Sequence, residues 1–201
     1  MTTTLETVRA QVAESARVKE ALLADDTLMG RIAEVADLLA ETYRNGGKTL
    51  WAGNGGSAAD AQHMAAELVN KFCLDRPGLP AIALTTDTSI LTAVGNDYGF
   101  DRVFAKQVEA HGRPGDVFIG ISTSGNSRNL VEALSACREK GVRTVALVGG
   151  SACAMDNYDY VIHVPSTETP RIQESQTLIG HILCFVVESR LFQSHFKTDS
   201  Q

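Results

Sequence analysis

Apolar residues recur at helical spacing through the first part of the chain. Within residues 5–44 they fall three or four apart, with an interruption near residues 24–27, which predicts two consecutive helices. The first helix carries an apolar stripe of its own, made of Leu5, Val8 and Val12. We therefore expect residues 1–44 to form a helical extension that packs on the rest of the chain and on partner subunits.

After residue 48 the pattern changes to short apolar runs that alternate with helical stretches. The expected strands are residues 49–53, 80–85, 117–122, 144–148 and 160–164. The expected helices are residues 58–69, 89–94, 103–110 and 130–137, and a last one that begins at Pro170. This alternation predicts an α/β fold with a five-stranded parallel sheet sandwiched by helices. No linker interrupts the chain, so we expect residues 1–201 to form a single domain.

A glycine-rich loop follows the first expected strand. The glycines of Gly53-Asn54-Gly55-Gly56 allow positive φ and let backbone N–H groups approach a ligand. Ser57 is suited to cap the next helix, whose positive N-terminal end would face the loop. The pattern predicts a phosphate or carboxylate site. It lacks the dinucleotide and P-loop spacings, so no nucleotide cofactor is expected.

His63 and Glu67 follow that loop on the same expected helix. They are four residues apart and therefore project from one face. An imidazole and a carboxylate together can move protons or bind a metal. The alternative is an ordinary exposed pair on an amphipathic helix, but the anion loop directly upstream favours a functional pair.

A second loop, residues 122–127, is rich in hydroxyl groups and follows the third expected strand. Ser122, Thr123, Ser124 and Ser127 can donate to phosphate oxygens, although an ordinary Ser/Thr turn would have the same composition. Open α/β sheets bind ligands at the carboxyl ends of their strands, where both loops would lie. We therefore expect the two loops to build one site.

Composition narrows the choice of partner. The net charge is −6, and no cluster of Lys and Arg is present, so neither nucleic acid nor an anionic membrane is an expected partner. The chain has no signal-peptide pattern and no apolar run of membrane-spanning length, which predicts a cytoplasmic protein. Its four cysteines form no C-x-x-C motif, and we expect them to be buried, reduced thiols. A small molecule is the expected partner.

Four motifs together resemble one family. They are Gly53 to His63, Gly95-Asn96-Asp97, Ser122 to Ser127, and Arg171-Ile172-Gln173-Glu174 with His181. They closely resemble the phosphoheptose isomerases, which have the flavodoxin-like sugar isomerase (SIS) fold, and the resemblance covers almost the whole chain. It implies conversion of sedoheptulose 7-phosphate to D-glycero-D-manno-heptose 7-phosphate, the first step of nucleotide-activated heptose synthesis. It also implies a homotetramer with active sites between subunits and one zinc ion per subunit.

The resemblance also implies roles for individual residues. The implied zinc ligands are His63, Glu67, Gln173 and His181. The implied substrate contacts are Asn54, Gly55, Gly56, Ser57, Glu67, Asn96, Asp97, Ser122, Thr123, Ser124, Ser127 and Gln173. Isomerisation through an enediol needs a base and a proton shuttle, for which Glu67 and His181 are the candidates. Thr169-Pro170 stands where some members have an acidic residue, which leaves the need for a carboxylate there open.

Helix geometry constrains the implied zinc site. Gln173 and His181 are eight residues apart, which is roughly 12 Å along a helix and about 80° around it. Two such side chains can hardly bind one metal ion from a continuous helix. Either Gln173 lies in a less regular turn before the helix, or different subunits build the site, and we expect the second.

Two non-enzymatic functions remain as alternatives. One is a tetrameric SIS-fold adaptor that binds a replication initiator protein. Such adaptors resemble this chain but lack the acidic residue at the position of Glu67. The other is a sensor that binds sugar phosphates without converting them.

Overall fold

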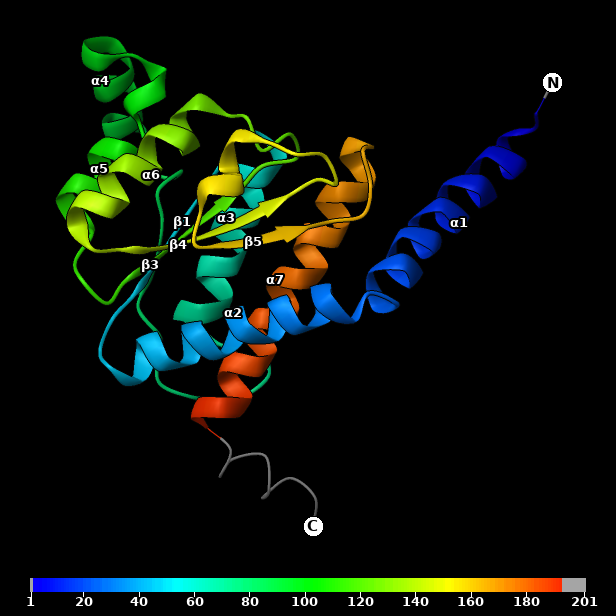
Figure 1. Ribbon diagram of the computed structural model, residues 1–201, viewed down its shortest axis with the longest axis horizontal. Coiled ribbons are helices and arrows are strands. Elements are labelled where there is room, and N and C mark those ends of the chain that lie inside the picture. The colour runs from blue at the N-terminus through cyan, green and yellow to red at the C-terminus, as the bar shows by residue number, and fades with distance from the viewer. Residues whose placement is uncertain (1, 193–201) are drawn as a thin grey trace.

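Five parallel strands form the centre of the molecule. The structure is a computed structural model and describes residues 2–192 (Figure 1). The strands are β1 (Thr49–Gly53), β2 (Ala81–Ala83), β3 (Val117–Ile121), β4 (Arg143–Val148) and β5 (Tyr160–His163). Their order in the sheet is β2-β1-β3-β4-β5, and every neighbouring pair is parallel. The predicted α/β fold is confirmed, and this strand order is that of flavodoxin-like proteins.

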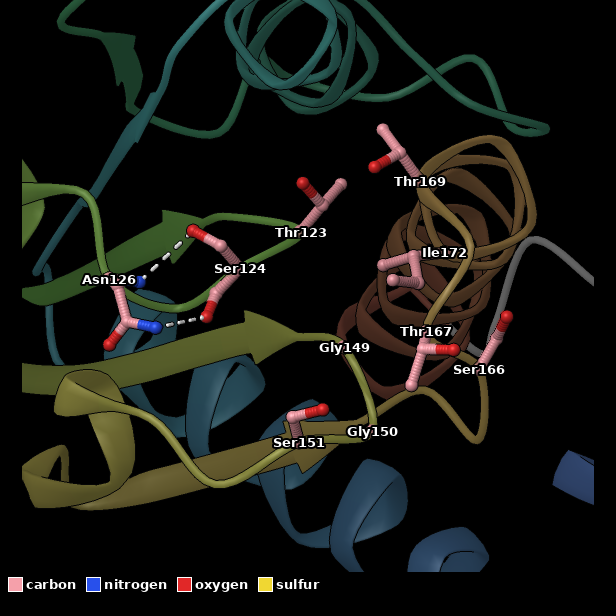
Figure 2. Close-up of a pocket in the computed structure, with 10 residues that line it drawn as sticks. All are labelled: Thr123, Ser124, Asn126, Gly149, Gly150, Ser151, Ser166, Thr167, Thr169 and Ile172. Atoms are coloured by element: carbon pink, nitrogen blue, oxygen red, sulfur yellow. Dashed lines mark hydrogen bonds between the residues drawn. The ribbon is translucent and has the colours of Figure 1, made fainter.

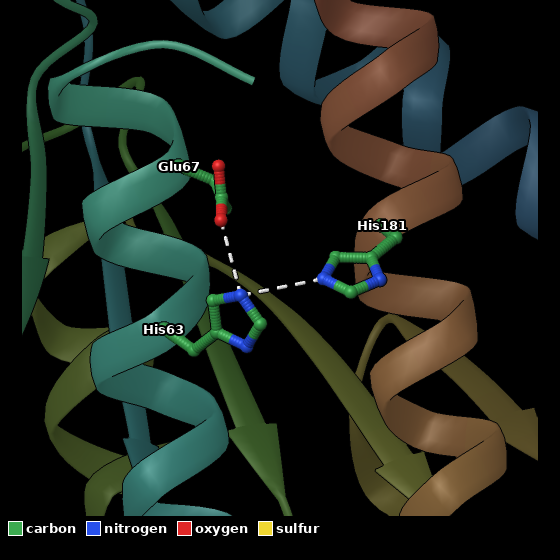
Figure 3. A group of neighbouring side chains, drawn as sticks. All are labelled: His63, Glu67 and His181. Atoms are coloured by element: carbon green, nitrogen blue, oxygen red, sulfur yellow. Dashed lines mark hydrogen bonds and ion pairs between the residues drawn. The ribbon is translucent and has the colours of Figure 1, made fainter. Parts of the chain in front are cut away.

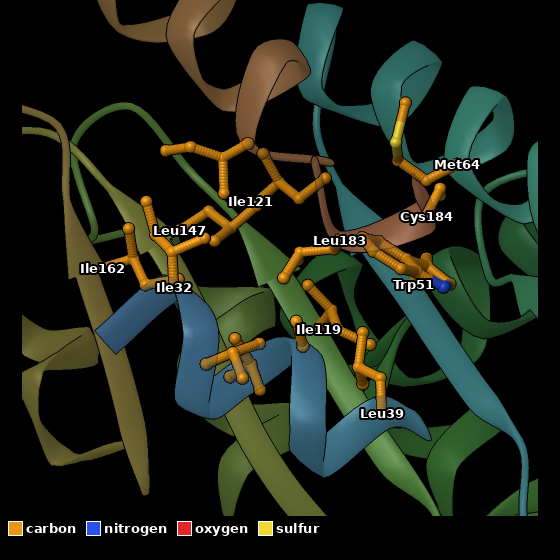
Figure 4. Packing of buried hydrophobic residues seen from close by; sticks show 14 of the residues in the cluster. Ile32, Leu39, Trp51, Met64, Ile119, Ile121, Leu147, Ile162, Leu183 and Cys184 are labelled. Atoms are coloured by element: carbon orange, nitrogen blue, oxygen red, sulfur yellow. The ribbon is translucent and has the colours of Figure 1, made fainter. Parts of the chain in front are cut away.

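Helices cover both faces of the sheet. They are α1 (Thr4–Leu23), α2 (Asp26–Arg44), α3 (Gly56–Val69), α4 (Thr88–Tyr98), α5 (Ala105–His111), α6 (Arg128–Lys140) and α7 (Thr169–Leu191), with short 3-10 helices η1 (Phe100–Arg102) and η2 (Ala154–Asn157). Alternate strand residues point to opposite faces. Trp51 and Ile119 therefore pack with α2, α3 and α7 in one core (Figure 4), whereas Leu50 and Phe118 pack with α5 and α6 in another.

Packing in the two cores fixes the register of the strands and therefore the position of each strand end. Each fully buried large apolar side chain contributes about 1.5–3 kcal/mol, and a slip of one residue would turn every strand side chain to the wrong face. The loops after β1 and β3 are consequently held next to each other at the carboxyl edge of the sheet. This is the topological switch point of the strand order, where such sheets bind ligands.

Helix α1 projects from the body of the molecule (Figure 1). Its C-terminal part is anchored by the buried side chains of Val18 and Leu22. Its N-terminal stripe is exposed, with Leu5 at 59%, Val8 at 55% and Val12 at 66% exposure. Packing of this stripe on a partner subunit stays a prediction.

Three local expectations were wrong. Helix α4 continues past residue 94 to Tyr98, so Asn96 and Asp97 lie in its last turn and not in a loop. The N-cap of α3 is Gly55, with φ of 56°, and not Ser57, whose side chain is buried. Cys73 is exposed and Cys153 half-buried, although all four cysteines are free thiols.

Within residues 2–192 the structure contains no helix that is both long enough and apolar enough to cross a bilayer.

Candidate active site

Helices α3 and α7 lie side by side and place His63, Glu67 and His181 together (Figure 3). His63 Nε2 lies 3.0 Å from Glu67 Oε1 and 3.4 Å from His181 Nε2. The two imidazole rings meet edge to face, with 4.9 Å between their centroids. The helices approach closely here because Gly180 faces Met64, and a Cβ at Gly180 would collide with the Met64 sulfur. The predicted pair on one helix thus becomes a three-residue group across two helices.

This group is suited to hold a zinc ion. Its three potential ligand atoms all lie within 4.8 Å of one another. Two ligands at about 2.1 Å from a tetrahedral zinc ion are roughly 3.4 Å apart, close to the spacing of the two imidazole nitrogens. Two histidines and one carboxylate, with a fourth position open, form a donor set typical of catalytic zinc. The donor chemistry and the spacing therefore fit the zinc ion that the family resemblance implies.

A polar pocket of about 120 Å³, here called the anion pocket, lies near the N-terminal ends of α3 and α7. It is lined by seven residues that were predicted to bind substrate, Asn54, Ser57, Ser122, Thr123, Ser124, Ser127 and Gln173, and by Ile121. Helices α3 and α6 both begin at this pocket, and neither has a side-chain hydrogen bond at its N-cap. Their unpaired N–H groups and positive dipole ends favour an anion. The two loops thus line one pocket.

Hydrogen bonds hold the two loops in place. The side-chain amides of Asn54 and Asn129 exchange two hydrogen bonds, at 3.0 and 2.9 Å, and so tie the first loop to α6. Ser122 Oγ accepts from the backbone N–H of Gly125 at 3.1 Å. Gly125 has φ of 64°, and a Cβ there would collide with Cys153, so only glycine fits this turn. The pocket is therefore formed before any ligand binds.

A larger hollow adjoins the anion pocket (Figure 2). Its volume is about 280 Å³, and it shares Thr123 and Ser124 with the anion pocket. Its other lining residues are Asn126, Gly149, Gly150, Ser151, Ser166, Thr167, Thr169 and Ile172. The lining includes no charged side chain, and Thr169 occupies the position where a carboxylate was in question.

Gln173 lies in α7 and therefore not in an irregular turn, so that alternative is wrong. Its side chain lines the anion pocket and faces Gly56, where a Cβ would lie 2.6 Å from Gln173 Nε2. Within one chain Gln173 thus lies eight residues from His181 on a continuous helix, or roughly 12 Å along it. Asn96 and Asp97 are exposed, hydrogen-bond to each other at 2.8 Å, and lie outside the lining of the anion pocket.

A buried ion pair that the sequence analysis missed supports the group of His63, Glu67 and His181. Arg76 and Glu188 are fully buried, with 2.8 Å between Nε and Oε1. Arg76 also donates to the backbone carbonyl of Glu67, and Glu188 accepts from the backbone N–H of Phe72. The Phe72 ring packs on His181, with 5.4 Å between ring centroids. The partners are 112 residues apart, so no local pattern indicates the pair.

Comparison with known proteins identifies the family of this chain. Residues 12–149 match the SIS domain family. The chain is 56% identical over 190 residues to the phosphoheptose isomerase of Aneurinibacillus thermoaerophilus, which covers 94% of this chain and 96% of the relative. It is 55% identical to phosphoheptose isomerase 2 of Campylobacter jejuni, with 94% of each chain covered. The structure of a phosphoheptose isomerase from Francisella tularensis matches with a TM-score of 0.89 at 40% identity, over 94% of this chain and 100% of the other. The chain therefore belongs to the phosphoheptose isomerase family of SIS-domain enzymes.

Proposed function

We propose that this enzyme converts sedoheptulose 7-phosphate to D-glycero-D-manno-heptose 7-phosphate, the first step of nucleotide-activated heptose synthesis. The observation that carries the proposal is the presence, on the same two helices α3 and α7, of a residue lining the anion pocket and of the group of His63, Glu67 and His181. A ketose phosphate needs both an anion site and an acid/base group, because its phosphate is remote from its reacting carbons. A cytoplasmic location stays a prediction.

The reaction requires proton transfers only. Glu67 removes a proton from C1 and returns it to C2, and the double bond moves from C2–O2 through the enediol to C1–O1. His181 donates a proton to O2 and accepts one from O1 through Nδ1, the ring nitrogen that does not face His63, so no oxidant or reductant is needed. A positioned base of this kind contributes roughly 10²–10⁴-fold in rate.

The anion pocket holds the phosphate in this proposal. Ser122, Thr123, Ser124 and Ser127 supply hydroxyl donors, and the N-termini of α3 and α6 supply positive potential. The phosphate does not react. Its binding energy instead positions C1 and C2 beside Glu67, which raises the rate of the proton transfers.

We propose that His63, Glu67 and His181 hold one zinc ion per subunit, with Gln173 as the fourth ligand. Such an ion, when bound, polarises substrate oxygens as a Lewis acid. Gln173 and His181 of one chain lie eight residues apart on the continuous helix α7, so the proposal includes a homotetramer in which neighbouring subunits complete each site. The exposed apolar residues of α1, and Tyr98 and Phe100 at 61% exposure each, are the candidate contacts. Monomeric protein with full activity would contradict this arrangement.

Neither alternative function is favoured. The adaptor lacks an acidic residue where this chain has Glu67, and the relatives above 50% identity are named isomerases. A sensor would bind sedoheptulose 7-phosphate without forming product.

The role of each residue can be tested with purified protein and sedoheptulose 7-phosphate, with and without added zinc. We expect Glu67→Gln to lose at least about 100-fold in kcat, because the base is gone. His181→Ala should lose kcat and also bound zinc. If Glu67→Gln retained full activity, the reaction could stand but Glu67 could not be its base.

A further inference from the structure

The hydroxyl-rich loop after β3 supplies half of the residues that line the anion pocket. It is held in place by residues 149–156, which follow β4 and are here called the bracing segment. At the start of this segment Gly149 N donates to Thr123 O at 3.2 Å (Figure 2). Near its end Met155 N donates to Gly125 O at 3.0 Å. The position of the loop therefore depends on both ends of the bracing segment.

His163 on β5 joins the two ends of the bracing segment. Its Nδ1 lies 2.7 Å from Gly149 O, and its Nε2 lies 3.0 Å from Asp156 Oδ1. Both partners are acceptors, so the ring donates to both of them only when each nitrogen carries a proton. In that form the imidazolium and the carboxylate make an ion pair. Among residues 2–192, Asp156 is the charged side chain that pairs with His163.

Asp156 also fixes the residues that contact the loop. Its Oδ2 accepts from Cys153 N at 2.9 Å, and its Oδ1 accepts from the Cys153 thiol at 3.3 Å. The hydrogen bond from Cys153 N, with smaller contributions from the thiol and His163, holds the pKa of Asp156 below its usual range. Cys153 packs against Gly125, where a Cβ would lie 2.7 Å from Cys153 Cβ. Asp156 thus connects His163 to a turn of the loop that accepts only glycine.

We propose that His163 and Asp156 are positioning residues for phosphate binding, because they hold the bracing segment and with it the loop after β3. The inference rests on the proposed function, which assigns the substrate phosphate to the anion pocket. Neither residue lines that pocket, so both act through the loop. Their side chains are 38% and 39% exposed, and an ion pair that is partly in water has a modest effect.

The test compares His163→Ala with two substitutions that each keep one of the hydrogen bonds. In His163→Asn the side-chain amide takes the place of Nδ1 and keeps the bond to Gly149. In His163→Gln it takes the place of Nε2 and keeps the bond to Asp156. For each protein, calorimetry gives the Kd of inorganic phosphate, and kinetics with sedoheptulose 7-phosphate give KM and kcat.

We expect Kd and KM of His163→Ala to rise together by about three- to tenfold. His163→Asn and His163→Gln should lie between His163→Ala and wild type. Asp156→Ala should weaken phosphate binding at least as much as His163→Ala, because Cys153 loses its acceptor as well. The matched control is His111→Ala, which changes an exposed side chain at the end of α5 and should resemble wild type.

These measurements separate positioning from a loss of structure. Met155 and Tyr158 anchor this part of the chain in the core, so His163→Ala should keep its Tm within about 4 °C of wild type. A loss of folded enzyme would lower kcat and leave both KM and the Kd of phosphate unchanged.

The inference is overturned if inorganic phosphate binds equally well to His163→Ala and wild type, or if wild type does not bind it. It is also overturned if His163→Asn and His163→Gln weaken binding as much as His163→Ala does. If wild type forms no product, the proposed function fails. The Kd of phosphate then still decides the role of His163, because that measurement needs no turnover.

Discussion

Replacing Glu188 by Gln should strongly destabilise the enzyme. Both carboxylate oxygens are in use, because Oε1 accepts from Phe72 N and Arg76 Nε and Oε2 accepts from Cys73 N and Leu74 N. An amide in the same place turns one acceptor into a donor that faces two N–H groups. It also leaves the Arg76 charge buried without its counter-ion.

The expected cost follows from the burial of the pair. Both side chains are 0% exposed, and removing one partner of such a pair costs about 3–5 kcal/mol. For a chain of this size about 1 kcal/mol corresponds to 2–4 °C, so Tm should fall by roughly 6–20 °C. Activity should fall too at temperatures where the variant is folded, because Arg76 holds the end of α3 that carries Glu67.

Urea and thermal unfolding followed by circular dichroism measure this effect. The matched control is Glu139→Gln on the exposed surface of α6, which should stay within about 0.5 kcal/mol of wild type. A Glu188→Gln variant whose free energy of unfolding lies within about 1 kcal/mol of wild type would refute the reasoning, because removing one partner of a buried ion pair costs more than that.

The stabilisation that the Glu188 carboxylate provides depends on pH. Burial acts to raise the pKa of Glu188, but hydrogen bonds from three backbone amides and Arg76 outweigh it and hold the pKa below 4.5. A depressed pKa means that the stabilisation is complete above the unfolded-state pKa and is lost as the pH falls through the folded-state pKa. Wild type should therefore lose stability below about pH 4.5, whereas Glu188→Gln lacks this contribution.

Three further predictions concern the site and the assembly. In Gly56→Ala the new Cβ would lie 2.6 Å from Gln173 Nε2, so the Gln173 side-chain amide must move. We expect KM to rise about fivefold with little change in stability. An unchanged KM would show that Gln173 does not contribute to substrate binding. His63→Ala should lower zinc content, measured by atomic emission, from one ion per subunit towards zero, and full retention would remove His63 from the ligand set. Val8→Asp with Val12→Asp should dissociate the oligomer in light scattering, and an unchanged mass would exclude the α1 stripe from the interface.

The fold was predictable because its signals are local. Each central strand is a short apolar run, and the loops that follow β1 and β3 are rich in glycine or hydroxyl groups. The spacing of four residues between His63 and Glu67 likewise predicts their shared face. Helix α4 was predicted too short because Gly95, Asn96 and Asp97 are typical of a loop. The structure keeps them helical in a helix that is capped at its start, where Asp87 Oδ1 accepts from Ile90 N at 2.9 Å.

Contacts between distant parts of the chain were not predictable. Asp60 and Thr177 are 117 residues apart, and only the packing of α3 on α7 brings them together. The pair of Arg76 and Glu188 depends on the same packing. The N-cap of α3 was misjudged for another reason: Ser57 has the usual capping side chain, but the positive φ of Gly55 lets the helix begin before it. The residue at which α3 begins is therefore set by the backbone geometry of the turn and not by the capping side chain.

We propose that this chain converts a ketose phosphate to an aldose phosphate with Glu67 as the base. The most direct measurement is the NMR spectrum of sedoheptulose 7-phosphate incubated with the zinc-loaded protein. We predict that aldose anomeric signals appear with wild type and stay absent with Glu67→Gln. Binding of the sugar phosphate by wild type with no aldose signal would contradict the claim and identify a sensor.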